Sequence, residues 1–339
     1  MNRIARRQFL QRAIALLGAG AVPSLQGGLG TARAQGSSGG DGSWPNRPVR
    51  FIVPLAAGGG LDFVARVVGE HMSRELGQQV FIENRTGAGG TIGIDMAIKS
   101  APDGYSVLVT NDNIAAAPHV QRLNIDYLKE LLPVSLLGRQ PQALAVHPSL
   151  TSVNSVADLL ALVKQRPTMG CATSGVGSNQ HVLLEWFARQ AGVKLDHVPY
   201  RGAGQAINDL VAGHVQIAFL GPTALLPHYK AGTVKLLAQS GETRSRSMPD
   251  IPTLKESGFA EISLESWYAA FVPLGTPAVA IERLNAAMKK ALDDPRTRDN
   301  FLKSATEPVG SSPEELARAA RADFEKYARL ISELNIRTN

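Results

Sequence analysis

Short aliphatic segments recur along the chain, and each is followed by a glycine-rich or polar loop and then by an amphipathic segment. The first three apolar segments, residues 49–55, 79–84 and 106–111, read VRFIVPL, QVFIEN and SVLVTN. Runs of this length, bounded by turn residues, predict buried strands. Strands that alternate with helices form sheets covered by helices, so this repeated unit predicts the α/β fold class.

The helical segments mark where each unit begins and ends. Apolar side chains recur at helical spacing over residues 61–76, and Gly77 follows as a left-handed C-cap. A later helix begins after Ser155, its expected N-cap, and Gly192 is expected to end the helix after that. A last amphipathic helix is expected from Ser312 to about Leu334. The strand–loop–helix pattern therefore continues to the end of the chain.

The pattern restarts after residue 147, which predicts two domains. We assign residues 44–143 together with 260–339 to the first domain and residues 144–259 to the second. Each is expected to be a doubly wound α/β domain with a mostly parallel sheet. Ligands of such sheets bind outside the carboxyl ends of the strands, so a cleft between the two domains is the predicted site.

The segment NRTGAGGTIGID, residues 84–95, places four glycines ahead of a predicted helix. No Lys-Ser or Lys-Thr closes it, so the P-loop pattern fails. The glycine spacing also misses G-x-G-x-x-G, because Ile92 occupies the third glycine position. Glycine turns at helix starts still present unpaired N–H groups and partial positive charge, which favour an anion such as a carboxylate.

The amino-terminal residues have the layout of an export signal. Arg6 and Arg7 precede a short, weakly apolar segment at residues 13–22, and Ala32 and Ala34 form an A-x-A cleavage pattern. The apolar run is too short to span a membrane. We predict that residues 1–34 are a twin-arginine-type signal peptide that is cleaved, and that the mature protein is periplasmic.

Removing this segment changes the charge of the protein. It contains five arginines and no acid, so the net charge falls from +6 to 6 − 5 = +1. The mature chain therefore offers no basic surface for nucleic acid or an anionic membrane. Residues 35–43, rich in glycine and serine, are predicted to be a flexible linker. Cys171 is the one cysteine, so no internal disulfide is possible.

The sequence contains no convincing catalytic or metal-binding constellation. No H-E-x-x-H, paired cysteine or histidine pair at helical spacing occurs, so we expect no metal site and no cofactor. Asp62 follows the first glycine loop and either caps the next helix, fixes that loop or orients a ligand. His181 is a base or hydrogen-bond donor in one interpretation and a helix-start packing residue in the other.

Neutral polar residues cluster where predicted strands end. Asn111 and Asn113 follow one strand, and Thr173, Ser174, Ser178 and Asn179 follow another. Each of these residue types is common in turns, but their convergence at strand ends suggests a ligand site.

Taken together, these motifs resemble the periplasmic solute receptors of tripartite tricarboxylate transporters, also called the Bug family. The matching stretches cover nearly the whole mature chain in order: WPNRPVRFIVPLAAGGGLDFVAR, GQQVFIENRTGAGGTIGID, APDGYSVLV, TSGVGSNQH, HVPYRGAGQAINDLVAGHVQIAF, LPHYKAGTVKLLAQS, MPDIPTLKESG and LNAAMKKALDDPRTRDNF. The resemblance implies a type II periplasmic-binding-protein fold that closes on its ligand.

The resemblance also implies where the ligand sits. Family members hold one carboxylate through two loops, partly by way of ordered waters; here these are residues 57–62 and 173–181. Residues 87–90 help to shape the first side. The candidate ligand-binding residues are Ala57, Gly58, Gly59, Gly60, Asp62, Gly87, Gly89, Asn111, Asn113, Thr173, Ser174, Gly177, Ser178, Gln180, His181, Gly202, Ala203, Leu220 and Gly221.

Two pairs of residues depart from the pattern of the family. Relatives often carry a polar pair after the strand near residue 219, where this chain has Leu220 and Gly221. An apolar or aromatic distal part of the ligand therefore suits the site better than a second carboxylate. Asp112 and Asn113 are also more polar than the small Ser/Thr run that the resemblance implies.

We interpret the chain as a monomeric periplasmic receptor, not an enzyme. It would capture a small organic carboxylate by flytrap closure and deliver it to the membrane permease subunits of a tripartite tricarboxylate transporter. A ligand-sensing receptor for a signalling partner is a close variant. The alternative from another class is an exported α/β enzyme acting on an organic acid, with Asp62 and His181 as acid and base.

Overall fold

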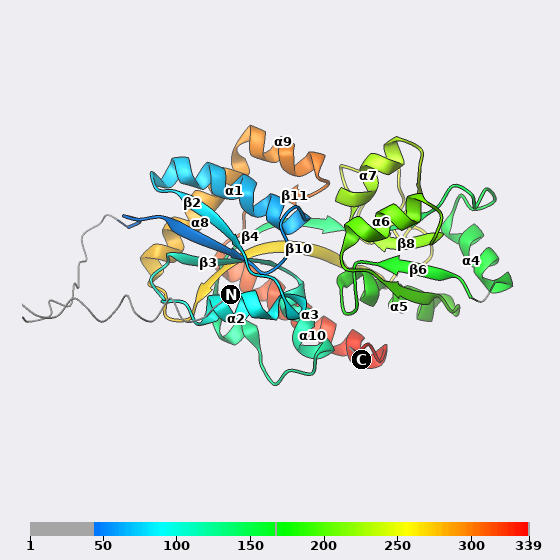
Figure 1. Cartoon of the computed structure of the whole chain (residues 1–339), viewed down its shortest axis with the longest axis horizontal. Coiled ribbons are helices and arrows are strands. Elements are labelled where there is room, and N and C mark those ends of the chain that lie inside the picture. Colours follow the sequence, from blue (N-terminus) through cyan, green and yellow to red (C-terminus); the bar gives the residue numbers. More distant parts are fainter. Residues whose placement is uncertain (1–43, 167, 338–339) are drawn as a thin grey trace, which may run out of the picture. The chain divides into compact units, whose positions relative to one another are not determined.

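The computed structural model describes residues 44–166 and 168–337, and these residues contain two β-sheets (Figure 1). The segment Ser43–Asn339 forms one compact unit. The predicted signal peptide, residues 1–34, and linker, residues 35–43, lie outside the described residues. In the described part of the chain, no helix has both the length and the apolar character needed to cross a membrane.

The first sheet has six strands in the order β11-β4-β10-β3-β1-β2. Its strands are β1 (Val49–Val53), β2 (Val80–Asn84), β3 (Ser106–Asn111), β4 (Leu131–Pro141), β10 (Glu265–Pro273) and β11 (Glu307–Pro308). Its helices are α1 (Gly60–Leu76), η1 (Ala88–Gly90), α2 (Thr91–Ile98), α3 (Asn113–Val120), η2 (Tyr127–Lys129), α8 (Ala278–Asp293), α9 (Pro295–Lys303) and α10 (Pro313–Glu333).

Helices cover both faces of this sheet. In β10, Tyr268 and Ala270 point into the core formed with α1, α8 and α9, whereas Trp267 and Phe271 point into the core formed with α2, α3 and α10. Successive strand residues face opposite sides of a sheet, so a strand buried on both faces is apolar at every position. Figure 1 shows α1 and α9 on one side of the sheet and α2 and α10 on the other.

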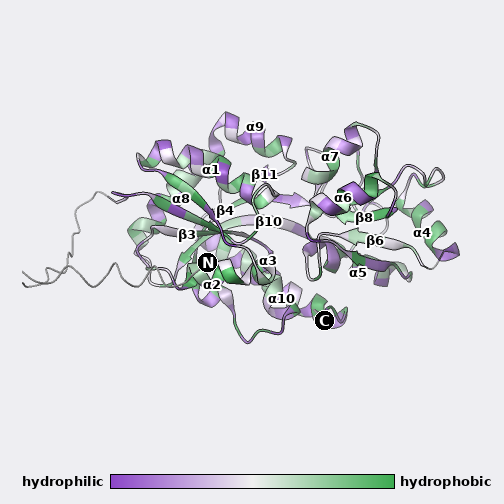
Figure 2. Cartoon of the chain, in the orientation of Figure 1, coloured by the Kyte–Doolittle hydropathy of each residue, from purple (hydrophilic) through white to green (hydrophobic). Residues whose placement is uncertain are grey.

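The second sheet has five strands in the order β7-β6-β8-β5-β9. Its strands are β5 (Ala143–Val146), β6 (Gly170–Thr173), β7 (Asp196–Pro199), β8 (Ile217–Leu220) and β9 (Lys235–Gln239). Its helices are α4 (Val156–Gln165), α5 (Asn179–Ala191), α6 (Ala203–Val211) and α7 (Pro222–Lys230). Along the outer helices of both sheets, hydrophilic and hydrophobic residues alternate, as expected for helices with one buried face (Figure 2).

The expectation that both sheets are mostly parallel is wrong. β1 pairs in parallel with β2 and β3, and β6 with β7 and β8. The pairings made by β4, β5 and β10 are all antiparallel. These three strands lie where the chain passes from one sheet to the other. Each sheet therefore combines a parallel part, built from βαβ units, with an antiparallel part that contains these connecting strands.

The chain passes between the sheets twice, and the two passages are hydrogen-bonded to each other. The Gln142 N–H donates to Ser240 Oγ at 2.8 Å, and the Ser240 N–H donates to the Gln142 carbonyl at 2.9 Å. The Leu264 N–H in turn donates to the Ser240 carbonyl at 3.1 Å. Two adjacent backbone connections of this kind form a natural hinge.

The chain leaves the first sheet at the end of β4 and enters the second at β5, which agrees with a domain boundary near residue 143. Helix α10, however, packs in the cores of both sheets. Leu316 and Ala320 pack beneath the first sheet, whereas Tyr327 and Leu330 pack with Phe187 of α5 in the core of the second. The assignment of all residues from 260 onward to one domain thus stays a prediction.

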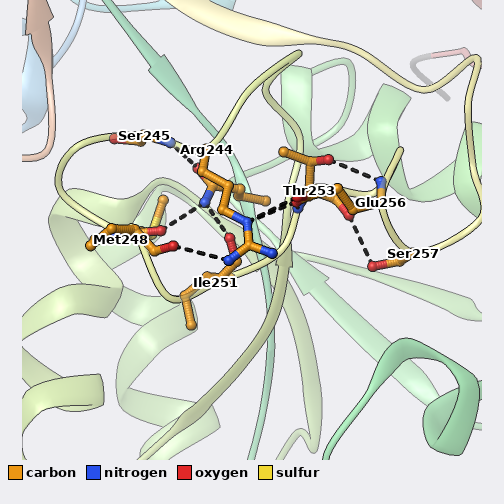
Figure 3. A network of polar contacts seen from close by, with 9 residues as sticks. Arg244, Ser245, Met248, Ile251, Thr253, Glu256 and Ser257 are labelled. Carbon is orange, nitrogen blue, oxygen red and sulfur yellow. Dashed lines mark hydrogen bonds and ion pairs between the residues drawn. The ribbon is translucent and has the colours of Figure 1, made fainter.

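The second passage is held by a polar network near the end of β9 (Figure 3). Gln239 Nε2 donates to the carbonyls of Met248 and Ile251 at 2.9 and 2.6 Å. Arg244 Nε donates to a Glu256 carboxylate oxygen at 2.9 Å. This network orders the long connection before it enters β10.

The predicted helix ends are confirmed. Ser155 Oγ accepts the Asp158 N–H at 3.1 Å, and Ser312 forms a capping box with Glu315. Gly77 and Gly192 end their helices with positive φ.

Candidate functional site

A cleft of about 630 Å³ opens between residues of the two sheets. The first sheet contributes the end of β3, η1, α3, and single residues of β10 and the β1–α1 loop. The second contributes the β6–α5 loop and the first residues of α5. The lining residues are Leu55, Ala88, Gly89, Asn111, Asp112, Asn113, Ala117, Val120, Gln121, Leu123, Ser174, Val176, Gly177, Ser178, Asn179, Gln180 and Ser266.

The start of α5 forms the second-sheet side of the cleft. Ser178 is the N-cap, and its Oγ accepts the His181 N–H at 3.2 Å. The two residues between them, Asn179 and Gln180, line the cleft. First-turn N–H groups have no acceptor within their own helix and lie at its positive end. This side of the cleft therefore presents backbone donors and partial positive charge.

Gly177 brings the β6–α5 loop against the opposite side of the cleft. Its φ is +74°, and a Cβ there would lie 2.6 Å from Val120 Cγ1 on α3. Its N–H donates to His181 Nδ1 at 3.0 Å. Both the backbone conformation and the close approach of α3 require glycine at this position.

On the first-sheet side, η1 is tied to α3. Asn113 Nδ2 donates to the Gly89 carbonyl, and Gln121 Nε2 donates to the Ala88 carbonyl at 3.2 Å. Gly89 has a φ of +66°. The glycine segment that suggested an anion site thus lines the cleft through Ala88 and Gly89 and is held there by side chains of α3.

Asp112 joins the two sides of the cleft. Its carboxylate accepts hydrogen bonds from Ser266 Oγ, from Tyr327 Oη of α10, and from Asn179 Nδ2 of α5 at 3.0 Å. Burial raises the pKa of Asp112, and these three hydrogen bonds oppose the rise. Because Asp112 belongs to the first sheet and Asn179 to the second, the network bridges the cleft.

The loop at residues 57–62 does not line the cleft. Asp62 is 4% exposed, and it accepts the Gly58 N–H at 2.9 Å, two N–H groups of Arg66 at 2.9 and 3.0 Å, and Asn84 Nδ2 at 3.0 Å. Burial disfavours the charged form, but these hydrogen bonds outweigh it and lower the pKa of Asp62. Among the roles expected for Asp62, the structure supports fixing the loop.

His181 and Thr173 lie behind the lining of the cleft. The His181 ring stacks on His197 with centroids 3.7 Å apart, and Thr173 Oγ1 lies 2.7 Å from His197 Nε2. Burial and the neighbouring His181 lower the pKa of His197 to about 4. The two rings pack behind the β6–α5 loop, and His181 Nδ1 accepts the hydrogen bond from the Gly177 N–H.

Leu220 is fully buried in the core between the second sheet and helices α6 and α7. It does not line the cleft. Gly221 lies at the hinge, where a Cβ would be 3.6 Å from Gln142 Oε1. The apolar lining comes from other residues, chiefly Val120, Leu123 and Val176.

The predicted site residues therefore divide into two sets. Those that line the cleft are Gly89, Asn111, Asn113, Ser174, Gly177, Ser178 and Gln180. Those that do not are Ala57, Gly58, Gly59, Gly60, Asp62, Gly87, Thr173, His181, Gly202, Ala203, Leu220 and Gly221. Contact of either set with a ligand stays a prediction.

Several lining residues were not predicted from the sequence. Ala117, Val120 and Gln121 share one face of α3 with Asn113, at helical spacing. Recognising a helix directly after β3 would have identified them. Ser266 comes from a strand distant in sequence and has no local signal.

Metal and thiol chemistry find no support in the described residues. No group of three or more His, Cys, Asp or Glu side chains among them is arranged to hold a metal ion. Cys171 is buried in β6, and burial raises the pKa of its thiol.

Comparison with known proteins identifies the family. The sequence model of the tripartite tricarboxylate transporter family receptors matches residues 64–336. Protein BugT of Bordetella pertussis is 33% identical over 295 residues, which are 86% of this chain and 90% of that protein.

Solved structures agree with this result. An R. palustris protein solved with adipate has a TM-score of 0.81 and 30% identity, covering 87% of this chain and 100% of that one. MatC from Rhodopseudomonas palustris with bound malate has a TM-score of 0.76 and 28% identity, covering 85% and 100%.

These similarities confirm the predicted fold class and the resemblance stated from the sequence. Members of this family are solute-binding receptors rather than enzymes, and they are exported, periplasmic proteins. The chain belongs to the tripartite tricarboxylate transporter receptor family of periplasmic solute-binding proteins.

Proposed function

We propose that this receptor binds a small organic molecule through a carboxylate group and delivers it to a tripartite tricarboxylate-type membrane transporter. The observation that carries the proposal is the composition of the cleft. Its described lining combines the starts of α3 and α5 with hydroxyl and amide side chains, and it contains no Lys, Arg or His. Such a site offers hydrogen bonds to an anion without a cationic side chain.

The donors suit one carboxylate. Two or more convergent N–H or O–H groups and a modest positive potential stabilise a carboxylate at a helix start. The first turn of α5 provides N–H groups of this kind on one side of the cleft. The hydroxyls of Ser174 and Ser178, which also line it, donate to Gln180 Oε1 and to the Gly175 carbonyl at 2.7 and 2.8 Å. An empty site of this kind leaves no unpaired cation buried.

The size and apolar surface suit the rest of a small molecule. A volume of about 630 Å³ lies within the usual range of ligand sites. Leu55, Val120, Leu123 and Val176 offer apolar surface to a carbon chain or ring. The adipate and malate named for two solved relatives are small carboxylates, which supports this ligand class.

Transport requires a conformational change. The hinge at Gln142, Ser240 and Leu264 would let the two sheets and their helices close on the ligand. A ligand shifts this equilibrium only by its differential affinity for the closed state. We infer that the closed monomer docks on the permease, and that the protein reaches the periplasm through a twin-arginine signal.

Isothermal titration calorimetry of the mature protein, beginning at residue 35, with mono-, di- and aromatic carboxylates tests the proposal. Stoichiometric binding, with the ligand recovered unchanged by mass spectrometry, is expected. Failure of every carboxylate to bind would overturn it. So would ligand turnover that disappears in His181→Ala, because that result would establish the enzyme alternative.

A further inference from the structure

Asp112 is the only charged side chain in the described lining of the cleft. It is 2% exposed and occupies the N-cap position of α3. A carboxylate inside a site proposed for carboxylates must influence which of them bind, because like charges in a site of reduced dielectric repel strongly.

The partners of Asp112 suit its ionised form. Ser266, Tyr327 and Asn179 all donate to it, and a carboxylate with hydrogen-bond donors around it is stabilised in the charged state. In the part of the chain that the structure describes, no Lys or Arg pairs with Asp112. Its negative charge is thus not neutralised by a cation.

A second acid lies nearby on α10. Asp323 adds to the effect of burial in raising the pKa of Asp112. Asp323 accepts Trp267 Nε1–H at 2.7 Å, and Lys326 Nζ lies 3.8 Å from its other oxygen. Lys326 offsets part of the charge of Asp323, and the three hydrogen bonds to Asp112 oppose the rise in its pKa.

Two acceptors beside Asp112 have no donor. Asn111 Oδ1 and Asn179 Oδ1 are buried, and neither receives a hydrogen bond from the described residues. Asn179 is 7% exposed, and both residues line the cleft. This part of the site is therefore rich in acceptors, which suits a ligand group that donates hydrogen bonds.

The position of Asp112 also limits the positive potential of the cleft. Asp112 occupies the N-cap position of α3, and its carboxylate accepts a hydrogen bond from Asn179, the first residue of α5. A helix N-terminus carries about half a unit of positive charge, and Asp112 offsets part of the charge that the starts of α3 and α5 supply. The remaining donors can hold one ligand carboxylate, whereas a second would meet an uncompensated negative field.

We propose that Asp112 determines the charge of the ligand: the cleft accepts a molecule with one carboxylate whose other end is neutral or donates hydrogen bonds, and it disfavours a second carboxylate. This inference rests on the proposed function, since it assumes that the cleft holds a carboxylate. The class it specifies is monocarboxylates with an apolar, hydroxyl or ammonium distal end.

Calorimetry with ligands of matched length tests the inference. Hexanoate, 6-hydroxyhexanoate, 6-aminohexanoate and adipate form one set, and four-carbon and aromatic sets extend it. We expect the best singly carboxylated member of each set to bind at least about tenfold more tightly than the dicarboxylate. This ranking uses the unaltered mature protein, so it is decisive even where a variant fails to fold.

Two variants separate charge from structure. Asp112→Asn removes the charge, and the preference against the dicarboxylate should fall by about tenfold. Tyr327→Phe removes a hydrogen bond to Asp112 and keeps the charge, so the preference should stay within about twofold. Dicarboxylates that bind best to the unaltered protein, or equal changes in both variants, would overturn the inference alone. Binding of no carboxylate would overturn the proposed function, and the inference with it.

Discussion

The two glycine loops that open α1 and α5 are built alike and behave differently. Each follows a parallel strand, and in each the third helical residue accepts the N–H of the residue before the N-cap. In α1 this acceptor is the Asp62 carboxylate, bonded to Gly58. In α5 it is the neutral Nδ1 of His181, bonded to Gly177.

The two loops differ in the charge of this acceptor, and they also differ in whether they line the cleft. Asp62 brings its own anion to the start of α1, together with Arg66 and Asn84, and that loop does not line the cleft. The α5 loop carries no anion of its own, and it lines the cleft. A helix start that already holds an internal carboxylate has less positive potential to offer a ligand. The comparison therefore predicts that the α5 loop dominates binding.

The largest expected effect is at Gly177. Gly177→Val would force a β-branched residue into φ +74° and against Val120, so carboxylate affinity should fall by more than about 100-fold. Calorimetry measures the change. The free energy of unfolding should also fall by about 1–2 kcal/mol, because a residue with a Cβ is strained at this positive φ. Unchanged affinity would show that the α5 loop is not the ligand-binding element.

The next largest effect is expected at Asp62, where a substitution should lower stability but leave ligand affinity nearly unchanged. Asp62→Ala removes a buried partner of Arg66 and of the Gly58 N–H, and we expect a loss of about 2–3 kcal/mol in unfolding free energy. Affinity should change less than about threefold. Arg66→Gln is the matched control, with a smaller loss, because Arg66 is half-exposed. If Asp62→Ala instead abolishes binding, the role that the family resemblance implies for residues 57–62 is correct.

The side chains that support the two loops should also make folding stability depend on pH, each over a different pH range. The pKa of His197 is lowered to about 4, so the unfolded chain binds the proton more tightly, and stability falls as pH decreases from about 6.5 to 4. We expect about 1–2 kcal/mol after allowance for partial exposure. Denaturant titrations of the protein and of His197→Gln measure it; the variant should lose this dependence.

Asp62 is an acid, whereas His197 is a base, and its contribution to stability is lost at a lower pH. Its pKa is lowered from the ordinary value, so its contribution is present above about pH 4 and disappears only below that. A stability loss in Asp62→Ala that already vanishes at pH 5 would contradict this assignment.

The smallest effect is expected at Gly59, the N-cap of α1. Its φ of −84° suits any residue, and a Cβ would lie 3.7 Å from the nearest atom, the Ala56 carbonyl oxygen. Gly59→Ala should change stability by less than about 1 kcal/mol and affinity by less than about twofold. A large loss of affinity at Gly59 would mean that the α1 loop closes over the ligand.

Local sequence signals predicted the elements well. Gly77, Gly192, Ser155 and Ser312 end or begin helices as expected, because caps depend on the residue itself and its immediate neighbours. The direction of β10 was not predictable in this way. Its antiparallel pairing with β3 and β4 depends on the route of the chain between the sheets, which leaves no trace in its own residues.

The candidate site was predictable only in part for the same reason. Ser174, Gly177 and Ser178 carry local signals of a loop before a helix, and they line the cleft. Asp62 carries the same kind of signal, but Arg66 and Asn84 pair with it away from the cleft. Which polar residue is satisfied internally depends on neighbours that spacing alone does not identify.

The sequence by itself determined the fold class and family of this protein, since strand and helix periodicity and the ordered motifs are properties of the chain. The tertiary structure decided which strand ends meet. It brought together Asp112, which precedes α3, Asn179, the first residue of α5, and Tyr327 of α10. The charge of a binding site is a sum over groups that are close in space. Only the folded arrangement could therefore reveal that the single charged side chain in the described lining of the cleft is an acid.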